Sequence, residues 1–306
     1  MSRQVDIAGK RTLITGASSG IGWATAKAFG AAGARLTITA RRRQRLEGLA
    51  SVITGEGGTT PLVVDADLSR RGEAARVATS VREAMGGVDI LVNNAGGGVG
   101  GMVWAVGDGD EARQQFEVDV WAPLALIHEL VPDMRRRREG TIVNVTSLRQ
   151  VFSWPGMGHS SGANAAMAII TESLRLELLR FGVHVIDVVP GPVNTPAQGP
   201  TKLLPGITEA VHARFGTAEP EEVAARIVAA VEAREPFVFC PESARAAYDD
   251  PVAFRAAMRV EVEALLGDLP LDEAGETFLD TFVAGNDDPL LMAARQQWEE
   301  QQQLRR

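Results

Sequence analysis

Short apolar runs alternate with longer stretches of mixed polarity along most of the chain. The first run, Thr12-Leu13-Ile14, leads through a glycine-rich segment into a helical stretch from Ile21 to Gly30. The same order recurs, with further strand-like runs at Leu36–Thr39, Leu62–Val64, Ile90–Val92, Ile142–Val145, Val183–Val189 and Phe237–Phe239. Nearly continuous apolar strands separated by helices are typical of a parallel sheet covered on both faces. The pattern predicts an α/β fold with a doubly wound parallel sheet of about seven strands.

The chain after Pro241 differs from the rest in charge. Acidic residues outnumber basic ones only from Glu242 onward, and that excess accounts for the whole net charge of −8. No repeat and no linker divides the preceding part. We therefore expect one domain over residues 1–241 and an acidic, mostly helical C-terminal extension over residues 242–306, packed on the cleft or at a subunit interface.

Composition excludes several classes of protein. Hydrophobic residues make up 45% and charged residues 23%, as in globular proteins, and no apolar run reaches the roughly 20 residues that span a membrane. The first ten residues do not read as a secretion signal, so a cytoplasmic location is expected. The single cysteine, Cys240, excludes an internal disulfide framework, and the histidine spacing predicts no metal site. The basic run Arg135–Arg138 is typical of a solvated helix end, so no nucleic-acid partner is expected.

Four segments fall where strands of such a sheet end. Thr15-Gly16-Ala17-Ser18-Ser19-Gly20-Ile21-Gly22 follows the first strand, where backbone N–H groups and a helix N-terminus can hold a pyrophosphate. Asp67-Leu68 follows the third strand, Asn93-Asn94-Ala95-Gly96 the fourth and Pro190-Gly191-Pro192-Val193-Asn194-Thr195 the sixth. Ligands of doubly wound sheets bind at this edge, so the four segments predict a dinucleotide site of the Rossmann type.

In order and spacing, these segments resemble the short-chain dehydrogenase/reductase superfamily from about Gly9 to Pro241. The resemblance implies that Gly16, Ser18, Ser19, Gly20, Ile21 and Gly22 hold the pyrophosphate of a nicotinamide dinucleotide. It also implies adenine contacts by Asp67 and Leu68, ribose contacts by Asn93, Ala95 and Gly96, and nicotinamide contacts from Pro190, Gly191, Val193 and Thr195. Members are usually dimers or tetramers, so a homodimer or homotetramer is expected.

The end of the second strand bears on the choice between NAD and NADP. An acidic side chain there would accept a hydrogen bond from the ribose 2′-hydroxyl, but this chain has Ala40, followed by Arg41 and Arg42. Guanidinium groups suit a 2′-phosphate, so NADP(H) is favoured over NAD(H). Alternatively, Arg42, Arg43 and Arg45 form a solvated helix face.

Three of the four positions that carry catalysis in the superfamily depart from its pattern. The resemblance assigns a serine to Ser147, which this chain keeps. Where the family has its tyrosine acid, this chain has Ser160. Where the family has the lysine that lowers the tyrosine pKa, it has Asn164, and where the family has an asparagine, it has Asp119. The only tyrosine, Tyr248, lies outside the matched body. His159 is another candidate acid, or a loop histidine without a catalytic role.

These exchanges change the expected chemistry. A serine hydroxyl is a far weaker acid than a phenol, and losing a lysine while gaining an aspartate moves the site by up to two charge units toward negative. We therefore predict an NADP(H)-dependent reductase of an iminium, imine or otherwise activated carbon. The alternatives are a non-redox isomerase, cyclase or dehydratase that retains the nucleotide, and a non-catalytic NADP-binding sensor.

Apolar residues near the site predict the kind of substrate. Met102, Val103 and Trp104 follow the fourth strand, and Trp154 and Met157 lie between Ser147 and Ser160. Residues 196–206 stand where relatives carry a lid, with Leu203 and Leu204 as an apolar inner side. A bulky apolar small molecule is the expected substrate, although these side chains are equally consistent with plain packing.

Overall fold

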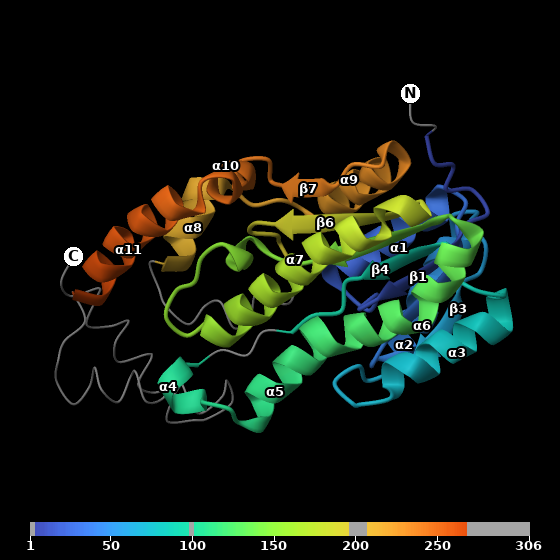
Figure 1. Cartoon of the computed structure of the whole chain (residues 1–306), viewed down its shortest axis with the longest axis horizontal. Helices are drawn as coiled ribbons and strands as arrows, with labels where there is room; N and C mark the ends of the chain where they lie inside the picture. Colours follow the sequence, from blue (N-terminus) through green and yellow to red (C-terminus); the bar gives the residue numbers. More distant parts are fainter. Residues whose placement is uncertain (1–3, 98–100, 196–206, 268–306) are drawn as a thin grey trace.

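A computed structural model describes the chain over residues 4–97, 101–195 and 207–267 (Figure 1). The expected lid, residues 196–206, and most of the expected extension, residues 268–306, lie outside the described residues. Among the described residues, no helix is both long and apolar enough to cross a membrane.

Seven strands of the described residues form one parallel sheet. They are β1 (Arg11–Thr15), β2 (Arg35–Ala40), β3 (Leu62–Asp65), β4 (Ile90–Asn93), β5 (Gly140–Val145), β6 (Val183–Pro190) and β7 (Phe237–Cys240). Their order is β3-β2-β1-β4-β5-β6-β7, and every pair is parallel. The strand order reverses direction between β1 and β4, and ligands of such sheets bind at the carboxyl ends beside this point. The prediction of a doubly wound sheet of about seven strands is confirmed.

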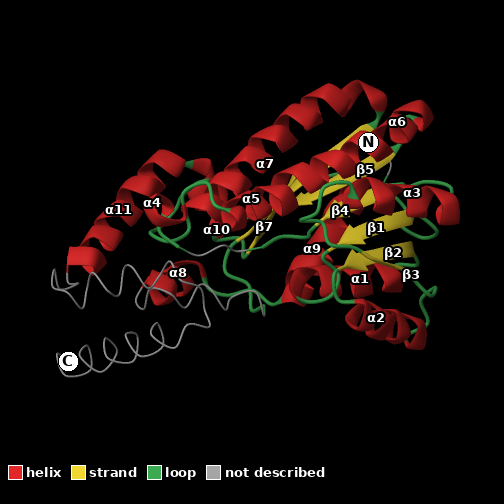
Figure 2. Cartoon of the chain, turned by 90° about the horizontal axis from the view of Figure 1, so that it is seen from below, coloured by secondary structure: helices red, strands yellow, loops and turns green. Residues whose placement is uncertain are grey.

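Helices connect the strands and cover both faces of the sheet, as Figure 2 shows from the edge. The long ones are α1 (Gly20–Ala31), α2 (Arg43–Gly55), α3 (Glu73–Met85), α6 (Ala122–Arg137), α7 (Gly158–Leu178) and α9 (Pro220–Ala233). Alternate strand residues face opposite layers: Ile14 and Ile38 pack with α1, α2 and α9, whereas Leu13 and Leu91 pack with α3, α6 and α7. This alternation buries both faces, which explains why most strand positions are apolar.

The remaining elements gather, with one exception, at the carboxyl ends of the strands. They are α4 (Val103–Val106), α5 (Asp110–Phe116), the π-helix η1 (Glu117–Trp121), the 3₁₀ turns η2 (Leu148–Gln150) and η3 (Leu179–Phe181), α8 (Ile207–Phe215), α10 (Ala244–Asp249) and α11 (Pro251–Gly267). Of these, η3 alone lies elsewhere, because it precedes β6. The others surround the edge at which β1, β4, β5 and β6 end (Figure 1).

The first part of the C-terminal extension packs on the segment that follows β5. Phe254 of α11 lies with its ring centroid 5.0 Å from that of Phe152 and 5.5 Å from that of Phe215 of α8. Arg255 donates from Nε to the carbonyl of Val151 at 2.5 Å. Met258 completes this apolar cluster. Helices α10 and α11 thus cover the segment that leads from Ser147 toward α7.

Candidate functional site

The loop between β1 and α1 is fastened to the loop after β4. The hydroxyl of Thr15 accepts hydrogen bonds from the backbone N–H groups of Asn94 and Ala95, both at 2.9 Å, and the Asn94 side chain donates to the Thr15 carbonyl at 2.9 Å. A Cβ on Gly16, whose φ is +68°, would lie 2.7 Å from the Cα of Ala95. The two loops at the reversal point of the sheet therefore approach so closely that only glycine fits at Gly16.

The start of α1 has the features of an anion site. A Cβ on Gly22 would lie 2.3 Å from Nδ2 of Asn94, so this turn also requires glycine. Ser19 is the N-cap residue of α1, but its side chain makes no capping hydrogen bond. Unpaired N–H groups in the first turn, together with the helix dipole, favour a phosphate there.

Arg42 lies across this loop from the end of β2. Its Nη2 donates to Oγ of Ser18 at 2.8 Å and to Oγ of Ser19 at 2.9 Å. Arg41 is exposed and lies close enough to Asp67 to contribute to the lowered pKa of that carboxyl, for which the hydrogen bond from the Ser69 hydroxyl is the main cause. The structure thus places Arg42 beside the serines of the glycine-rich loop and Arg41 near Asp67, whereas the side chain of Ala40 is buried.

The remaining predicted cofactor residues line the same edge of the sheet. Leu68 is buried directly after β3. Asn93 donates from Nδ2 to Oδ1 of Asn144 at 2.9 Å, which ties the ends of β4 and β5 together. Thr195 lies beside the pyrophosphate loop, because a Cβ on Gly20 would meet its methyl group at 3.1 Å. The structure therefore brings together segments from the ends of β1, β3, β4 and β6, as expected for one elongated ligand.

After β6, the chain is held by backbone contacts. The N–H of Gly191 donates to the carbonyl of Cys240 at 2.9 Å, and Val193 forms an isolated β-bridge with Ala218. Pro190 and Val193 are buried. These contacts fix the predicted nicotinamide-side segment up to Thr195, the last described residue before residue 207.

Ser147 follows the end of β5 by two residues and caps the 3₁₀ turn η2. Its Oγ accepts a hydrogen bond from the backbone N–H of Arg149 at 3.2 Å. The hydroxyl proton is therefore not used in this contact and can be donated to another acceptor. Ser147 is half-buried at the carboxyl edge of the sheet, as its predicted position requires.

The two positions on α7 offer no acid. Ser160 is fully buried, and its Oγ has no hydrogen-bond partner among the described residues. Asn164 turns back on its own helix and donates from Nδ2 to the Ser160 carbonyl at 2.9 Å. The ring of Tyr248 packs 5.1 Å from that of Phe239, and burial raises the pKa of its hydroxyl.

His159 faces the loop between α4 and α5. Its Nε2 lies 2.7 Å from the carbonyl oxygen of Gly107, and because a carbonyl can only accept, Nε2 carries the proton. This contact links the first turn of α7 to that loop. Nδ1 is the ring nitrogen left for any proton exchange.

Asp119 lies on η1 and is held against the loop after β4. Its Oδ1 accepts from the backbone N–H of Gly97 at 3.2 Å, and its Oδ2 accepts from Nε2 of Gln115. Gln115 also donates to the Gly97 carbonyl at 2.9 Å. Burial raises the pKa of Asp119 to about 7, while these donors and Arg149 oppose the shift. A carboxyl group with this pKa exists in both protonation states near neutral pH.

Arg149, which sequence reasoning missed, is the second charged group near this position. Burial lowers the pKa of its guanidinium, while the carboxylate of Asp119 raises it. Its Nε is buried and has no hydrogen-bond partner among the described residues. The exchanges at the predicted catalytic positions suggested a negative local charge, but Arg149 adds a positive charge nearby. The signal was present in the sequence, since Arg149 stands two residues after Ser147 at a strand end.

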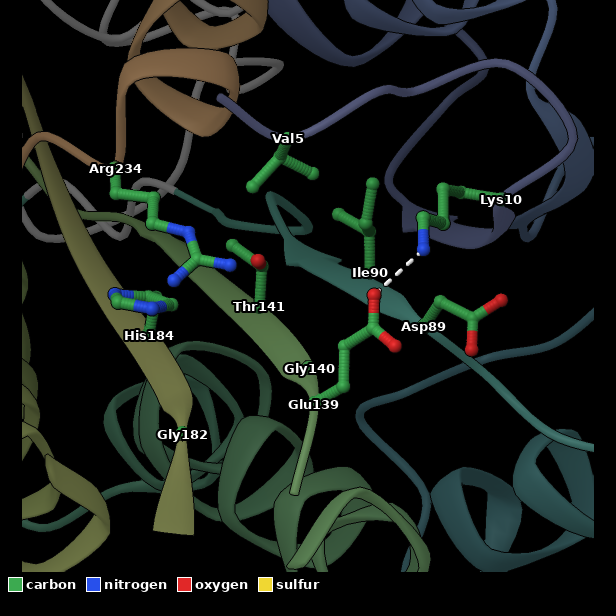
Figure 3. Close-up of a pocket in the computed structure, with 10 residues that line it drawn as sticks. All are labelled: Val5, Lys10, Asp89, Ile90, Glu139, Gly140, Thr141, Gly182, His184 and Arg234. Atoms are coloured by element: carbon green, nitrogen blue, oxygen red, sulfur yellow. Dashed lines mark hydrogen bonds and ion pairs between the residues drawn. The ribbon is translucent and has the colours of Figure 1, made fainter. Parts of the chain in front are cut away.

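A pocket at the opposite edge of the sheet takes no part in this arrangement. It is lined at the amino ends of β4, β5 and β6 by residues that include Lys10, Asp89, Glu139, His184 and Arg234 (Figure 3). Lys10 and Glu139 pair at 2.6 Å across it. Since the predicted site residues all lie at the carboxyl ends, this pocket is separate from them.

Comparison with known proteins identifies the family. A family model described as short chain dehydrogenase matches residues 10–203. A fatty acyl-CoA reductase of Mycobacterium tuberculosis is 34% identical over 238 residues, which cover 75% of this chain and 81% of the relative. The chain therefore belongs to the short-chain dehydrogenase family and is an oxidoreductase of that type. The resemblance inferred from the four loop segments is confirmed.

Solved structures share both fold and sequence with the chain. L-sorbose reductase from Gluconobacter frateurii, complexed with NADPH and L-sorbose, gives a TM-score of 0.70 at 30% identity, covering 77% of this chain and 97% of that one. A short-chain dehydrogenase from Sphingobium yanoikuyae, in complex with NADPH, gives a TM-score of 0.68 at 27% identity over 86% of this chain and 98% of that one. Both are bound to the reduced, phosphorylated nicotinamide cofactor.

Proposed function

We propose that the protein is an NADP(H)-dependent reductase that transfers hydride to an iminium, imine or otherwise activated carbon without a tyrosine–lysine acid. The observation that carries the proposal is the start of α7, where Ser160 is fully buried and Asn164 bonds to its own helix. A ketone reduced by hydride needs a proton donor for its oxygen, whereas an iminium needs none, because its nitrogen becomes neutral on accepting the electron pair.

The residues around the β1–α1 loop fit a phosphorylated dinucleotide. Gly16 and Gly22 permit the close loop packing, α1 has an uncapped first turn, and Arg42 lies over the two serines of the loop. A 2′-phosphate near Arg42 would receive a charge-assisted hydrogen bond, which supports NADP(H) over NAD(H). The NADPH-bound relatives agree with this preference. When bound, the cofactor supplies the hydride.

The chain's own residues orient and stabilise the substrate. In its ionised state, Asp119 attracts a cationic nitrogen and disfavours a neutral ketone. Ser147, whose hydroxyl proton is uncommitted, donates to a substrate acceptor. Gln115 holds the Asp119 carboxylate to the loop after β4, next to Gly96, whose added Cβ would lie 3.5 Å from Oδ1. The carboxylate is thereby positioned before the substrate arrives.

The reaction is tested by following NADPH absorbance with matched cyclic imines and ketones. We expect oxidation by the imines only, and a 10- to 100-fold lower kcat/KM for Asp119→Asn, about the effect of losing a hydrogen bond to a charged group. Glu117→Gln removes a neighbouring carboxylate of η1 and is the matched control. Equal turnover of ketones, or an unaffected Asp119→Asn variant, would refute the proposal.

The pH profile provides an independent readout for the same group. Because Asp119 must be ionised to attract a cation and its pKa is about 7, kcat/KM for the imine should rise with pH through that value. The acidic limb should be absent in Asp119→Asn. At higher pH the imine itself loses its proton, so a bell-shaped profile is expected for the unaltered enzyme.

Apolar side chains near η2 and α4 support a bulky apolar substrate. Trp104 is 71% exposed and Val103 is 53% exposed, although both are large apolar residues. Trp154 packs against Phe152 with their ring centroids 5.2 Å apart. Met157 is buried, so this residue contributes to packing. Substrates with an aromatic or branched group should therefore have lower KM values than small imines.

One face of α7 supports a homodimer or homotetramer. Ile169 and Leu176, seven residues apart on the same side of the helix, are 74% and 68% exposed, and Leu179 beyond them is 72% exposed. Apolar side chains in such a row favour a symmetric interface. Light scattering should give the mass of a dimer or tetramer for the unaltered chain and that of a monomer for Ile169→Glu/Leu176→Glu. A monomeric unaltered chain would refute this assembly.

A further inference from the structure

Arg149 and Asp119 carry opposite charges that interact with each other without forming an ion pair. Each shifts the pKa of the other, yet among the described residues they form no direct ion pair. Asp119 is instead held by Gly97 and Gln115. The Arg149 guanidinium therefore has an incomplete set of partners.

Arg149 lies in the turn that begins at Ser147, and its charge interacts with that of Asp119. Its backbone N–H donates to Ser147, so the guanidinium and the retained serine belong to one 3₁₀ turn at the end of β5. Helix α7 packs against both η1 and η2, which carry Asp119 and Arg149. Both residues are only partly buried, so a ligand can reach the exposed part of each, although Nε of Arg149 itself is buried.

A guanidinium whose Nε–H is buried without an acceptor is costly for a folded protein. Arginine stays protonated at all accessible pH values, and a buried N–H donor without an acceptor loses its hydrogen bond to water without compensation. Such a group is retained where a ligand supplies the missing acceptors. The planar guanidinium matches a carboxylate, which can accept two parallel hydrogen bonds.

We propose that Arg149 is a specificity residue that binds a carboxylate of the substrate, so that the enzyme reduces imino acids. This inference rests on the proposed imine reduction and names its substrate class. The iminium nitrogen lies toward Asp119 and the carboxylate toward Arg149, so a zwitterion satisfies both charges at once. Hydride adds to the iminium carbon, the C=N electron pair moves to nitrogen, and the products are an amino acid and NADP⁺. The carboxylate is unchanged.

The kinetic test compares dihydroisoquinoline with the derivative that carries a carboxylate at the imine carbon. The unaltered enzyme should have a 10- to 100-fold higher kcat/KM for the carboxylated imine, mainly through KM. In Arg149→Met this ratio should fall to about one, and Arg149→Lys should keep part of it. Arg136→Met, which removes an exposed arginine at the end of α6, is the matched control and should keep the full ratio.

A binding measurement separates this inference from the proposed reaction. Calorimetry with the enzyme–NADP⁺ complex compares tetrahydroisoquinoline with its carboxylated form, and each variant is first checked for NADP⁺ binding as evidence of folding. A carboxylate preference in binding that Arg149→Met abolishes supports the inference. If neither imine is then turned over, that result refutes only imine reduction. Equal affinity for the two compounds, or a preference that survives Arg149→Met, overturns the inference whether or not imines are reduced.

Discussion

Asp187 is a buried carboxyl group whose ionisation should cost stability. It lies on β6 with 2% exposure, and its Oδ1 accepts a hydrogen bond from the Thr146 hydroxyl at 2.7 Å. Burial raises its pKa to about 6, and the charge of Glu172 adds to the shift, whereas Thr146, Gln150 and Arg175 oppose it. The folded chain therefore holds this proton to a higher pH than the unfolded chain does.

The size of the effect follows from the two pKa values. The shift from 3.8 to about 6 corresponds to about 3 kcal/mol, at about 1.4 kcal/mol per unit. Because the folded pKa is the higher one, this contribution is fully present below the unfolded pKa, declines as pH rises toward 6 and is lost above it. Between pH 5 and pH 8 the expected loss is about 1.4 kcal/mol.

The perturbation is Asp187→Asn, which keeps the shape and can still accept the Thr146 hydrogen bond but does not ionise. Urea unfolding of both proteins should show the variant gaining about 1.4 kcal/mol relative to the unaltered chain when pH rises from 5 to 8. Asp119 titrates in both proteins, so its contribution cancels. Asp108→Asn, at a side chain that is 92% exposed, controls for removing one charge. A stability difference that does not change with pH would refute the reasoning.

Three further substitutions test the cofactor loop and the extension. Arg42→Ala should weaken NADPH binding 10- to 100-fold and NADH binding far less, as measured by nicotinamide fluorescence; equal effects on both would contradict a 2′-phosphate contact. Gly22→Ala should destabilise the fold by about 1–3 kcal/mol and so lower the melting temperature, because the new methyl group would lie 2.3 Å from Asn94 Nδ2. An unchanged melting temperature would show that the loop can shift. Phe254→Ala should cost about 3–5 kcal/mol in urea unfolding, and a loss below about 1 kcal/mol would mean that α11 adds little to the fold.

The sheet and its loops could be predicted from the sequence because both depend on local patterns. A buried parallel strand such as β6 needs an apolar run, and close loop packing at Gly16 and Gly22 needs glycine, so the residues themselves carry the information. The prediction of the family followed from the same positions. Its specific chemical assignments at Ser147, Ser160 and Asn164 stay predictions.

The charge balance could not be predicted in the same way, because it depends on contacts between distant segments. Asp119 and Arg149 are 30 positions apart in the sequence. Their proximity follows only from the packing of η1 and η2 on α7. The bond from Gln115 to Asp119 spans one helical turn and could have been expected from i, i+4 spacing. The contact of His159 with Gly107 depends on the path of a loop, which no periodicity indicates.

The packing of α11 on the segment after β5 has a consequence for the order in which the chain folds. Arg255 and Val151 are separated by 104 residues, which the ribosome adds in roughly 5 to 20 seconds. During that interval β1 to β5 can already pair, while Phe152 has no apolar cover from Phe254. The nucleotide-binding half should therefore form early in synthesis and the substrate side late, so that products of premature termination expose an aromatic surface to chaperones.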